Sequence, residues 1–164
     1  MTASATKPAV EAPALPGALD HSRLTYLLGY ATSRASIELK KDFRRHLGGP
    51  LGLKAVEFSI LMLLLSNQDV NPKQLCEALD VSAPNMAITI DRLAERGWVE
   101  RSRSTRDRRA VIVDLTPAGR DLALRADRIA RSMEQTPLQV LTAAERALLI
   151  ELLFKVARGR REPA

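Results

Sequence analysis

Residues 71–98, which read NPKQLCEALDVSAPNMAITIDRLAERGW, decide the fold because they contain two helix starts and a helix stop. Asn71 can cap a helix whose first residue is Pro72, where the missing N–H of proline costs nothing. Ser82 can cap a second helix, and Gly97 offers a left-handed stop at its end. The pattern therefore predicts two helices joined by a tight turn, over residues 72–79 and 82–96.

The two expected helices have one apolar side and one exposed side. Apolar residues at helical spacing would lock the pair together: Leu75, Leu79, Val81, Met86, Ile90 and Leu93. The start of the second helix would then expose Ala83, Pro84, Asn85, Ala87, Ile88 and Thr89. Such a pair fits a helix-turn-helix, whose second helix enters the major groove of DNA by its N-terminal end. An ordinary helical hairpin is the alternative that these two helices leave open.

The segment after this pair favours the first interpretation. Alternating residues predict two strands, over 98–102 and 110–115, joined by a loop rich in arginine. Between residues 92 and 109 arginine is the only base used: Arg92, Arg96, Arg101, Arg103, Arg106, Arg108 and Arg109. A solvated face would mix lysine and acids in comparable number, whereas arginine suits phosphate and the narrow minor groove. We expect Asp107 to pair with Arg109 and fix its direction, although Asp107 could also cap a turn.

The stretch LCEALDVSAPNMAITIDRLAERGWVERSRSTRDRRAVIVDLTPAGRDL resembles the MarR family of dimeric winged-helix transcription regulators. The resemblance rests on the end of the second helix, the Asp-x-Arg pattern within DRR and the following LTPAG, and it extends over residues 20–158. It implies that residues 82–89 face the major groove and that Asp107 and Arg109 form a pair at the wing tip. The DNA-binding residues expected on this basis are Ser82, Ala83, Pro84, Asn85, Ala87, Ile88, Thr89, Arg92, Arg103, Arg106, Asp107, Arg108 and Arg109.

The flanking segments complete a mainly α fold with a small β-hairpin wing, a winged helix-turn-helix domain plus a helical dimerisation region. Asp20 can cap a helix that runs to residue 46, and GGPLG at residues 48–52 would end that helix. A nearly all-apolar helix is expected over residues 53–66, at the centre of the fold. Thr116 with Pro117 begins a further helix, and a last one spans 142–157. The expected parts are a disordered arm (1–19), a dimerisation helix and linker (20–52), the winged domain (53–116), dimerisation helices (117–158) and a tail (159–164).

Composition narrows the function classes. The formal charge of +6 and pI near 10 predict an anionic partner, and double-stranded DNA fits the motif. No apolar run approaches the length of about 18 residues that a membrane helix needs, and no secretory signal is visible, so we expect a cytoplasmic protein. The single cysteine, Cys76, excludes an internal disulfide and reads as structural. We expect no metal, no cofactor and no enzymatic activity, since His21 and His46 lie near no nucleophile motif.

Two further expectations concern assembly and control. The first helix and the last two have apolar faces too wide for one small domain to cover, which predicts a homodimer on a palindromic operator rather than a monomeric bundle. Proteins of the resembled family often bind small aromatic acids or other lipophilic compounds, which implies a ligand site near Tyr26, Tyr30, Ser33, Arg34 and Met62. Ordinary packing is the alternative for these residues. The function expected is a repressor released by a small ligand, and the alternative is an architectural, ligand-independent nucleic-acid-binding protein.

Overall fold

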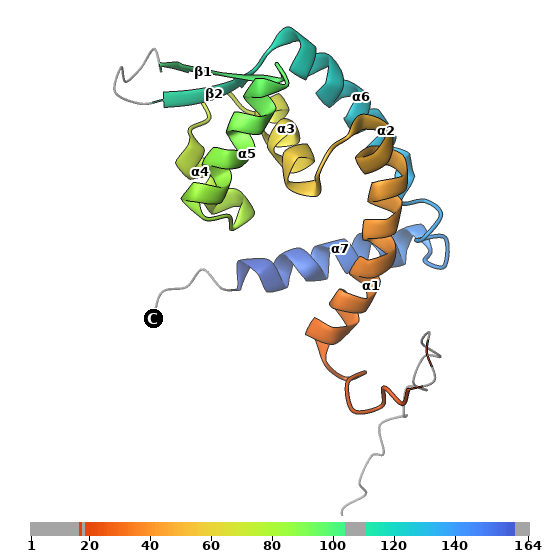
Figure 1. Cartoon of the computed structure of the whole chain (residues 1–164). Coiled ribbons are helices and arrows are strands. Elements are labelled where there is room, and N and C mark those ends of the chain that lie inside the picture. The colour runs from red at the N-terminus through yellow and green to blue at the C-terminus, as the bar shows by residue number, and fades with distance from the viewer. Residues whose placement is uncertain (1–16, 18, 104–110, 160–164) are drawn as a thin grey trace, which may run out of the picture. The chain divides into compact units, whose positions relative to one another are not determined.

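The computed structural model describes residues 17, 19–103 and 111–159 (Figure 1). The chain divides into two compact units, residues 1–40 and 41–164, and the first long helix crosses the boundary between them. The elements are α1 (Leu28–Phe43), η1 (Arg44–Gly48), α2 (Gly49–Leu51), α3 (Ala55–Ser66), α4 (Pro72–Leu79), α5 (Ala83–Glu95), β1 (Val99–Arg103), β2 (Val111–Leu115), α6 (Pro117–Met133) and α7 (Ala143–Arg158). A mainly helical chain with one antiparallel hairpin confirms the predicted fold class.

The first helix begins at Leu28, so the prediction that Asp20 caps it is wrong. The Asp20 carboxylate accepts hydrogen bonds from the backbone N–H and the hydroxyl of Ser22, at 2.8 and 3.0 Å. These bonds close a local turn around the aspartate, and such turns compete with helix formation. Residues 22–26 follow as turns, beside which the Leu24 N–H donates to the His21 carbonyl and the Leu27 N–H donates to the Leu24 carbonyl.

The GGPLG segment ends the helical path later than predicted. Residues 44–48 form one π-helical turn, and a short helix, α2, continues through Pro50. Pro50 lies near the start of that new segment, where its missing N–H leaves no bond unmade. The break comes at Gly52, whose φ of 62° is left-handed and suits glycine.

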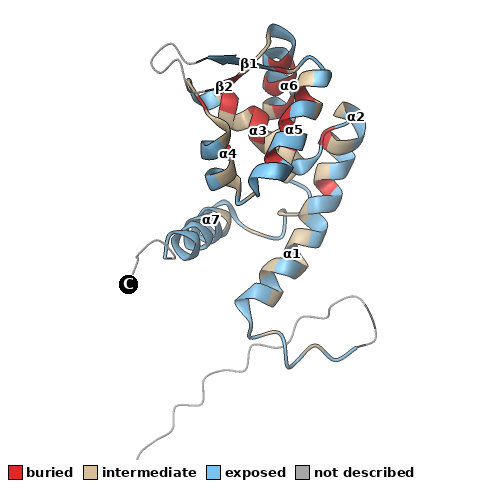
Figure 2. Cartoon of the chain, turned by 60° about the vertical axis from the view of Figure 1, so that its left-hand side comes forward, coloured by how far each residue is buried: buried red, intermediate tan, exposed pale blue. Residues whose placement is uncertain are grey.

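Buried side chains of α3, α4, α5, α6 and the hairpin form the core (Figure 2). α3 contacts α4, α6 and β2, which confirms the prediction that this nearly all-apolar helix is central. The largest fully buried side chains are Leu47, Ile60, Leu61, Leu75, Met86, Ile90, Leu93, Glu57 and Val113. Of the residues predicted to lock the helix pair, Leu75, Met86, Ile90 and Leu93 are buried, and Leu79 and Val81 pack against them half-buried.

The predicted caps of the helix pair differ in detail. Asn71 and Gln74 form a reciprocal capping box at the start of α4, with two hydrogen bonds of 2.9 Å between backbone N–H and side-chain oxygen. Ser82 occupies the capping position of α5, yet its side chain makes no capping hydrogen bond. Gly97 has a φ of 70°, as the predicted left-handed stop requires.

The hairpin is anchored at its base. β1 and β2 are antiparallel, with Val99 opposite Leu115 and Arg103 opposite Val111. The Val113 N–H donates to the Val70 carbonyl at 2.8 Å, which ties the hairpin to the segment before α4. At its end, Thr116 caps α6 by accepting from the Gly119 N–H at 3.0 Å, as the sequence predicted.

The last helix, α7, begins with a capping box between Thr142 and Glu145. Its apolar residues are exposed: Leu148, Leu149, Ile150, Leu152, Leu153, Phe154 and Val156. Among the described residues, none of the helices taken singly is both long and apolar enough to cross a membrane. One bent pair, 28–51 with 55–66, meets the criteria of length and composition.

Candidate nucleic-acid interface

The start of α5 is an exposed face. Ser82, Ala83, Pro84, Asn85, Ala87 and Ile88 are all exposed, as the sequence predicted, and 56% of the Ile88 surface is accessible. Met86 and Ile90, on the opposite side of the helix, are fully buried. The burial of these two residues fixes the rotation of α5, so the same residues that form the core also determine which side chains point outward.

Thr89 does not share this face, and its predicted exposure is wrong. Its side chain is buried, and its hydroxyl donates to the Asn85 carbonyl one turn earlier at 2.8 Å. Thr89 follows Met86 by three residues and precedes Leu93 by four. That spacing places it at the border of the buried side, and it is a signal that the sequence already contained.

Three of the four described arginines in the predicted basic cluster are engaged within the chain. Arg92 lies 3.3 Å from the buried carboxylate of Glu57, and Arg96 lies 3.9 Å from the same group. Arg101, on β1, pairs with Asp91 of α5 at 2.7 Å and so links the hairpin to the helix. Arg103, the last residue of β1, is exposed. No local spacing indicates Glu57 as a partner, because it lies 35 residues before Arg92.

The hairpin tip lies outside the described residues. Arg106, Asp107, Arg108 and Arg109 all belong to it, so the pairing of Asp107 with Arg109 stays a prediction. The described strands pair as far as Arg103 and Val111.

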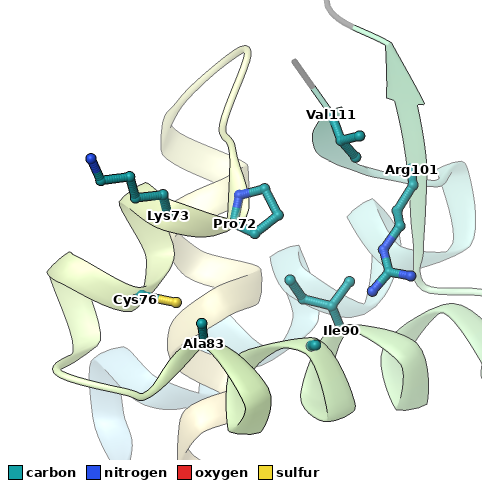
Figure 3. Close-up of a pocket in the computed structure, with 8 residues that line it drawn as sticks. Pro72, Lys73, Cys76, Ala83, Ile90, Arg101 and Val111 are labelled. Carbon is teal, nitrogen blue, oxygen red and sulfur yellow. The ribbon is translucent and has the colours of Figure 1, made fainter. Parts of the chain in front are cut away.

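A hollow of about 440 Å³ lies between α4, the start of α5 and the hairpin (Figure 3). Its lining is mostly apolar, with two basic side chains: Pro72, Lys73, Cys76, Ala83, Ala87, Ile90, Arg101 and Val111. Cys76 is half-buried and also packs against the core, which is compatible with the structural role predicted for it. Ala83 and Ala87 of the exposed α5 face line the hollow together with Arg101 and Val111 of the hairpin.

The residues predicted to hold a ligand do not all come together. Tyr30 and Arg34, one turn apart on α1, are half-buried, whereas Tyr26 and Ser33 are exposed. Met62 belongs to the other unit, where it packs against the core, as the alternative interpretation stated.

Sequence reasoning missed the role of His21 near these residues. Its Nδ1 and the Tyr30 hydroxyl are hydrogen-bonded, and the two rings lie 5.9 Å apart. The turns at residues 22–26 bring His21 to Tyr30, and no local sequence pattern predicts this contact. Among the described residues, no cluster of histidine, cysteine or carboxylate side chains could hold a metal ion.

Comparison with known proteins identifies the family. The model of the MarR family matches residues 53–111. The multiple antibiotic resistance protein MarR of Escherichia coli is 32% identical over 108 residues, which are 65% of this chain and 75% of that protein. The chain belongs to the MarR family. This confirms the resemblance that the sequence carried.

Two solved structures of MarR-family regulators are similar to this chain. The transcriptional repressor CouR, bound to a 23-mer DNA duplex, is 32% identical with a TM-score of 0.78, covering 86% of this chain and 99% of CouR. BpsR of Bordetella bronchiseptica, whose DNA binding is regulated by 6-hydroxynicotinic acid, is 26% identical with a TM-score of 0.71, covering 82% of this chain and 95% of BpsR. The chain is therefore a winged-helix transcriptional regulator, and its relatives are regulators rather than enzymes, in agreement with the sequence prediction.

Proposed function

We propose that this MarR-family chain is a sequence-specific DNA-binding repressor that reads the major groove with α5 and the adjacent minor groove with the hairpin tip. The exposed face from Ser82 to Ile88 carries the proposal. It is flanked by a hairpin that leads to the arginine-rich tip, and the whole chain carries a charge of +6. CouR, bound to a DNA duplex, supports this reading.

The exposed face favours particular bases. Asn85 offers an amide that can bond in two places to adenine, whereas Ala87 and Ile88 offer apolar contact to the methyl group of thymine. Arg92 and Arg103 would contact the phosphate backbone. At the tip, Arg106 and Arg108 would contact phosphate, while Asp107 would direct Arg109 into the minor groove.

The active form is proposed to be a homodimer. Seven large apolar residues of α7 are exposed, and 64% of the Phe154 surface is accessible. Such a contiguous apolar surface is rare on a monomer and is commonly an interface. Residues 20–52 and 117–158 would form the dimerisation region around the winged domain, 53–116. A two-fold dimer presents two copies of α5, so the operator would be a palindrome with half-sites about one helical turn apart.

The effector is proposed to be a small aromatic acid held near His21, Tyr30 and Arg34. In the described residues, His21 Nε2 and Arg34 Nε are buried and make no hydrogen bond. The Arg34 atom always carries a proton, so it favours an acceptor such as a carboxylate. Tyr26 and Ser33 would close the site from the exposed side. BpsR, which responds to 6-hydroxynicotinic acid, supports this ligand class.

DNA binding is tested by fluorescence anisotropy with a labelled duplex from upstream of the gene, at several salt concentrations. Arg103→Ala should lower the affinity and reduce the salt slope by about 1, because one phosphate contact is lost. Arg131→Ala is the matched control, since Arg131 pairs with Asp127 on α6. Arg109→Ala should lose most of the affinity. Footprinting separates the alternatives, because a short symmetric footprint supports a regulator and uniform coverage supports an architectural protein.

The dimer and the ligand have separate tests. Leu149→Glu with Leu153→Glu should give a monomer in sedimentation equilibrium and weaken operator binding, because two charges would be buried between subunits. A dimer that survives both changes would contradict the interface. For the ligand, a panel of hydroxylated benzoic and nicotinic acids should release the parent from DNA, and Arg34→Ala should abolish that release while leaving DNA affinity intact.

A further inference from the structure

Glu57 is a fully buried acid beside the apolar core. It belongs to the first turn of α3, and only 1% of its surface is exposed. A buried carboxylate is costly unless charged or hydrogen-bonding partners surround it. The residues around Glu57 therefore show what holds the charge in place.

The two oxygens of Glu57 face different partners. Oε2 accepts a hydrogen bond of 2.8 Å from the Lys54 backbone N–H, which closes the first turn of α3. Oε1 accepts a bond of 3.3 Å from Arg92 Nη1, and Arg96 Nη1 lies 3.9 Å from Oε2. Arg92 lies in the last turn of α5, and Arg96 follows it by four residues, just beyond the helix. One buried acid therefore faces two basic side chains on the same side of α5.

Arg96 extends this contact to two more segments. Its Nη1 donates to the Gly52 carbonyl at 2.8 Å, and its guanidinium lies over the Trp98 ring at 3.6 Å from the ring centre. Trp98 directly precedes β1, and its carbonyl accepts from the Thr116 N–H at the end of the hairpin. The acid therefore lies where α3, the end of α5 and the base of the hairpin meet.

Arg92 is only partly covered by this arrangement. Its side chain keeps 39% of its accessible surface, although one N–H is directed to Glu57. A guanidinium has further N–H groups in a planar fork, and fixing one of them fixes the direction of the others. A partly exposed arginine whose guanidinium plane is fixed by a buried acid is preorganised to bind a phosphate oxygen on its exposed side.

We propose that Glu57 is a positioning residue for operator recognition, and that its buried charge fixes Arg92 and the C-terminal end of α5 in the orientation that binds DNA. The inference rests on the proposed DNA-binding function. It assigns Glu57 no contact with DNA, since the carboxylate is buried. Its role is to hold an arginine that would otherwise move freely and bind phosphate without fixed register.

Loss of this charge should affect specific and non-specific binding differently. Without the acid, Arg92 loses its fixed direction and is repelled by Arg96, so operator contacts that depend on orientation weaken. Non-specific binding depends on charge and would stay constant or rise, because the chain becomes more positive. A general loss of structure would instead lower both affinities together, which makes the ratio of the two affinities the decisive quantity.

The experiment compares Glu57→Gln with the parent on an operator duplex and on a scrambled duplex of the same length. Glutamine keeps an oxygen for the Lys54 N–H, removes the charge and turns an NH2 group, which cannot accept a hydrogen bond, toward Arg92. The ratio of operator to scrambled affinity should fall by about tenfold, as expected for coupled neighbouring groups. Glu77→Gln is the control, because Glu77 is exposed on α4 and pairs with Lys73, so the same charge is removed away from the core.

Several outcomes decide the proposal. An unchanged ratio, or equal loss on both duplexes with the fold intact by circular dichroism, would overturn it. If Glu57→Gln does not fold, Arg92→Lys replaces it, since lysine keeps the charge but not the planar fork, and an unchanged ratio in that variant would equally refute the proposal. A parent chain that binds no operator would refute the proposed function itself.

Discussion

Gly119 lies where the start of α6 meets the base of the hairpin, and no larger residue fits there. A Cβ at this position would lie 1.8 Å from the Trp98 carbonyl oxygen and 2.7 Å from the carbonyl carbon. These are backbone atoms, so no side-chain rotation relieves the contact. Gly119→Ala would therefore force α6 and the hairpin apart by more than an ångström.

The magnitude follows from the bonds that such a shift breaks. The Thr116 N–H donates to the Trp98 carbonyl at 3.1 Å, and the Thr116 hydroxyl donates to the Gly97 carbonyl at 2.6 Å. Losing both costs about 2 kcal/mol, and overpacking adds about 1–3 kcal/mol. Alanine has a higher helix propensity than glycine, which offsets about 1 kcal/mol of this destabilisation. The free energy of unfolding should therefore fall by about 2–4 kcal/mol.

Urea unfolding followed by tryptophan fluorescence measures this effect, because Trp98 is the only tryptophan in the chain and lies at the contact. The transition midpoint should fall while the slope stays constant. Gly29→Ala is the control, since a Cβ there meets nothing within 4 Å and the helix propensity gain should leave stability equal or higher. A Gly119→Ala protein as stable as the parent would refute the close-approach reasoning.

Two predictions concern helix starts. Asn71→Ala should lower the free energy of unfolding by about 1 kcal/mol because the capping bond to Gln74 is lost, whereas Ser82→Ala should change it little, since that hydroxyl makes no capping bond. Thermal unfolding compares the pair, and equal losses would contradict the assignment. At the start of α7, hydrogen bonds from the Thr142 backbone N–H and then its hydroxyl lower the pKa of Glu145 from 4.5. The ionised carboxylate therefore stabilises this turn above pH 4.5, and the stabilisation is lost as the pH falls through the lower folded pKa. An NMR titration of the Thr142 amide should follow that loss, and Glu145→Gln should remove the pH dependence.

Local sequence patterns predicted much of the fold, because helix starts and apolar helix faces depend on residues that are close in sequence. Asn71 with Pro72, and Thr116 with Pro117, each begin a helix where predicted, since capping depends on residues within one turn. The apolar spacing from Leu75 to Leu93 anticipated the packing of α4 on α5. The start of α1 was missed for an equally local reason, because Asp20 satisfied its carboxylate in a turn with Ser22 instead of a helix.

For the candidate interface, too, local sequence patterns predicted one part and tertiary packing determines the other. The sequence alone placed a helix-turn-helix, a hairpin with an arginine-rich tip and an exposed face from Ser82 to Ile88, because periodicity determines which side of a helix is apolar. Only the tertiary structure showed which acidic partners the arginines have within the protein. Arg92 faces Glu57 from 35 residues away, and Arg101 reaches across from β1 to Asp91. Such partners are chosen when separate elements pack together, so tertiary packing, and not the local spacing, determines which arginines are held by the protein itself.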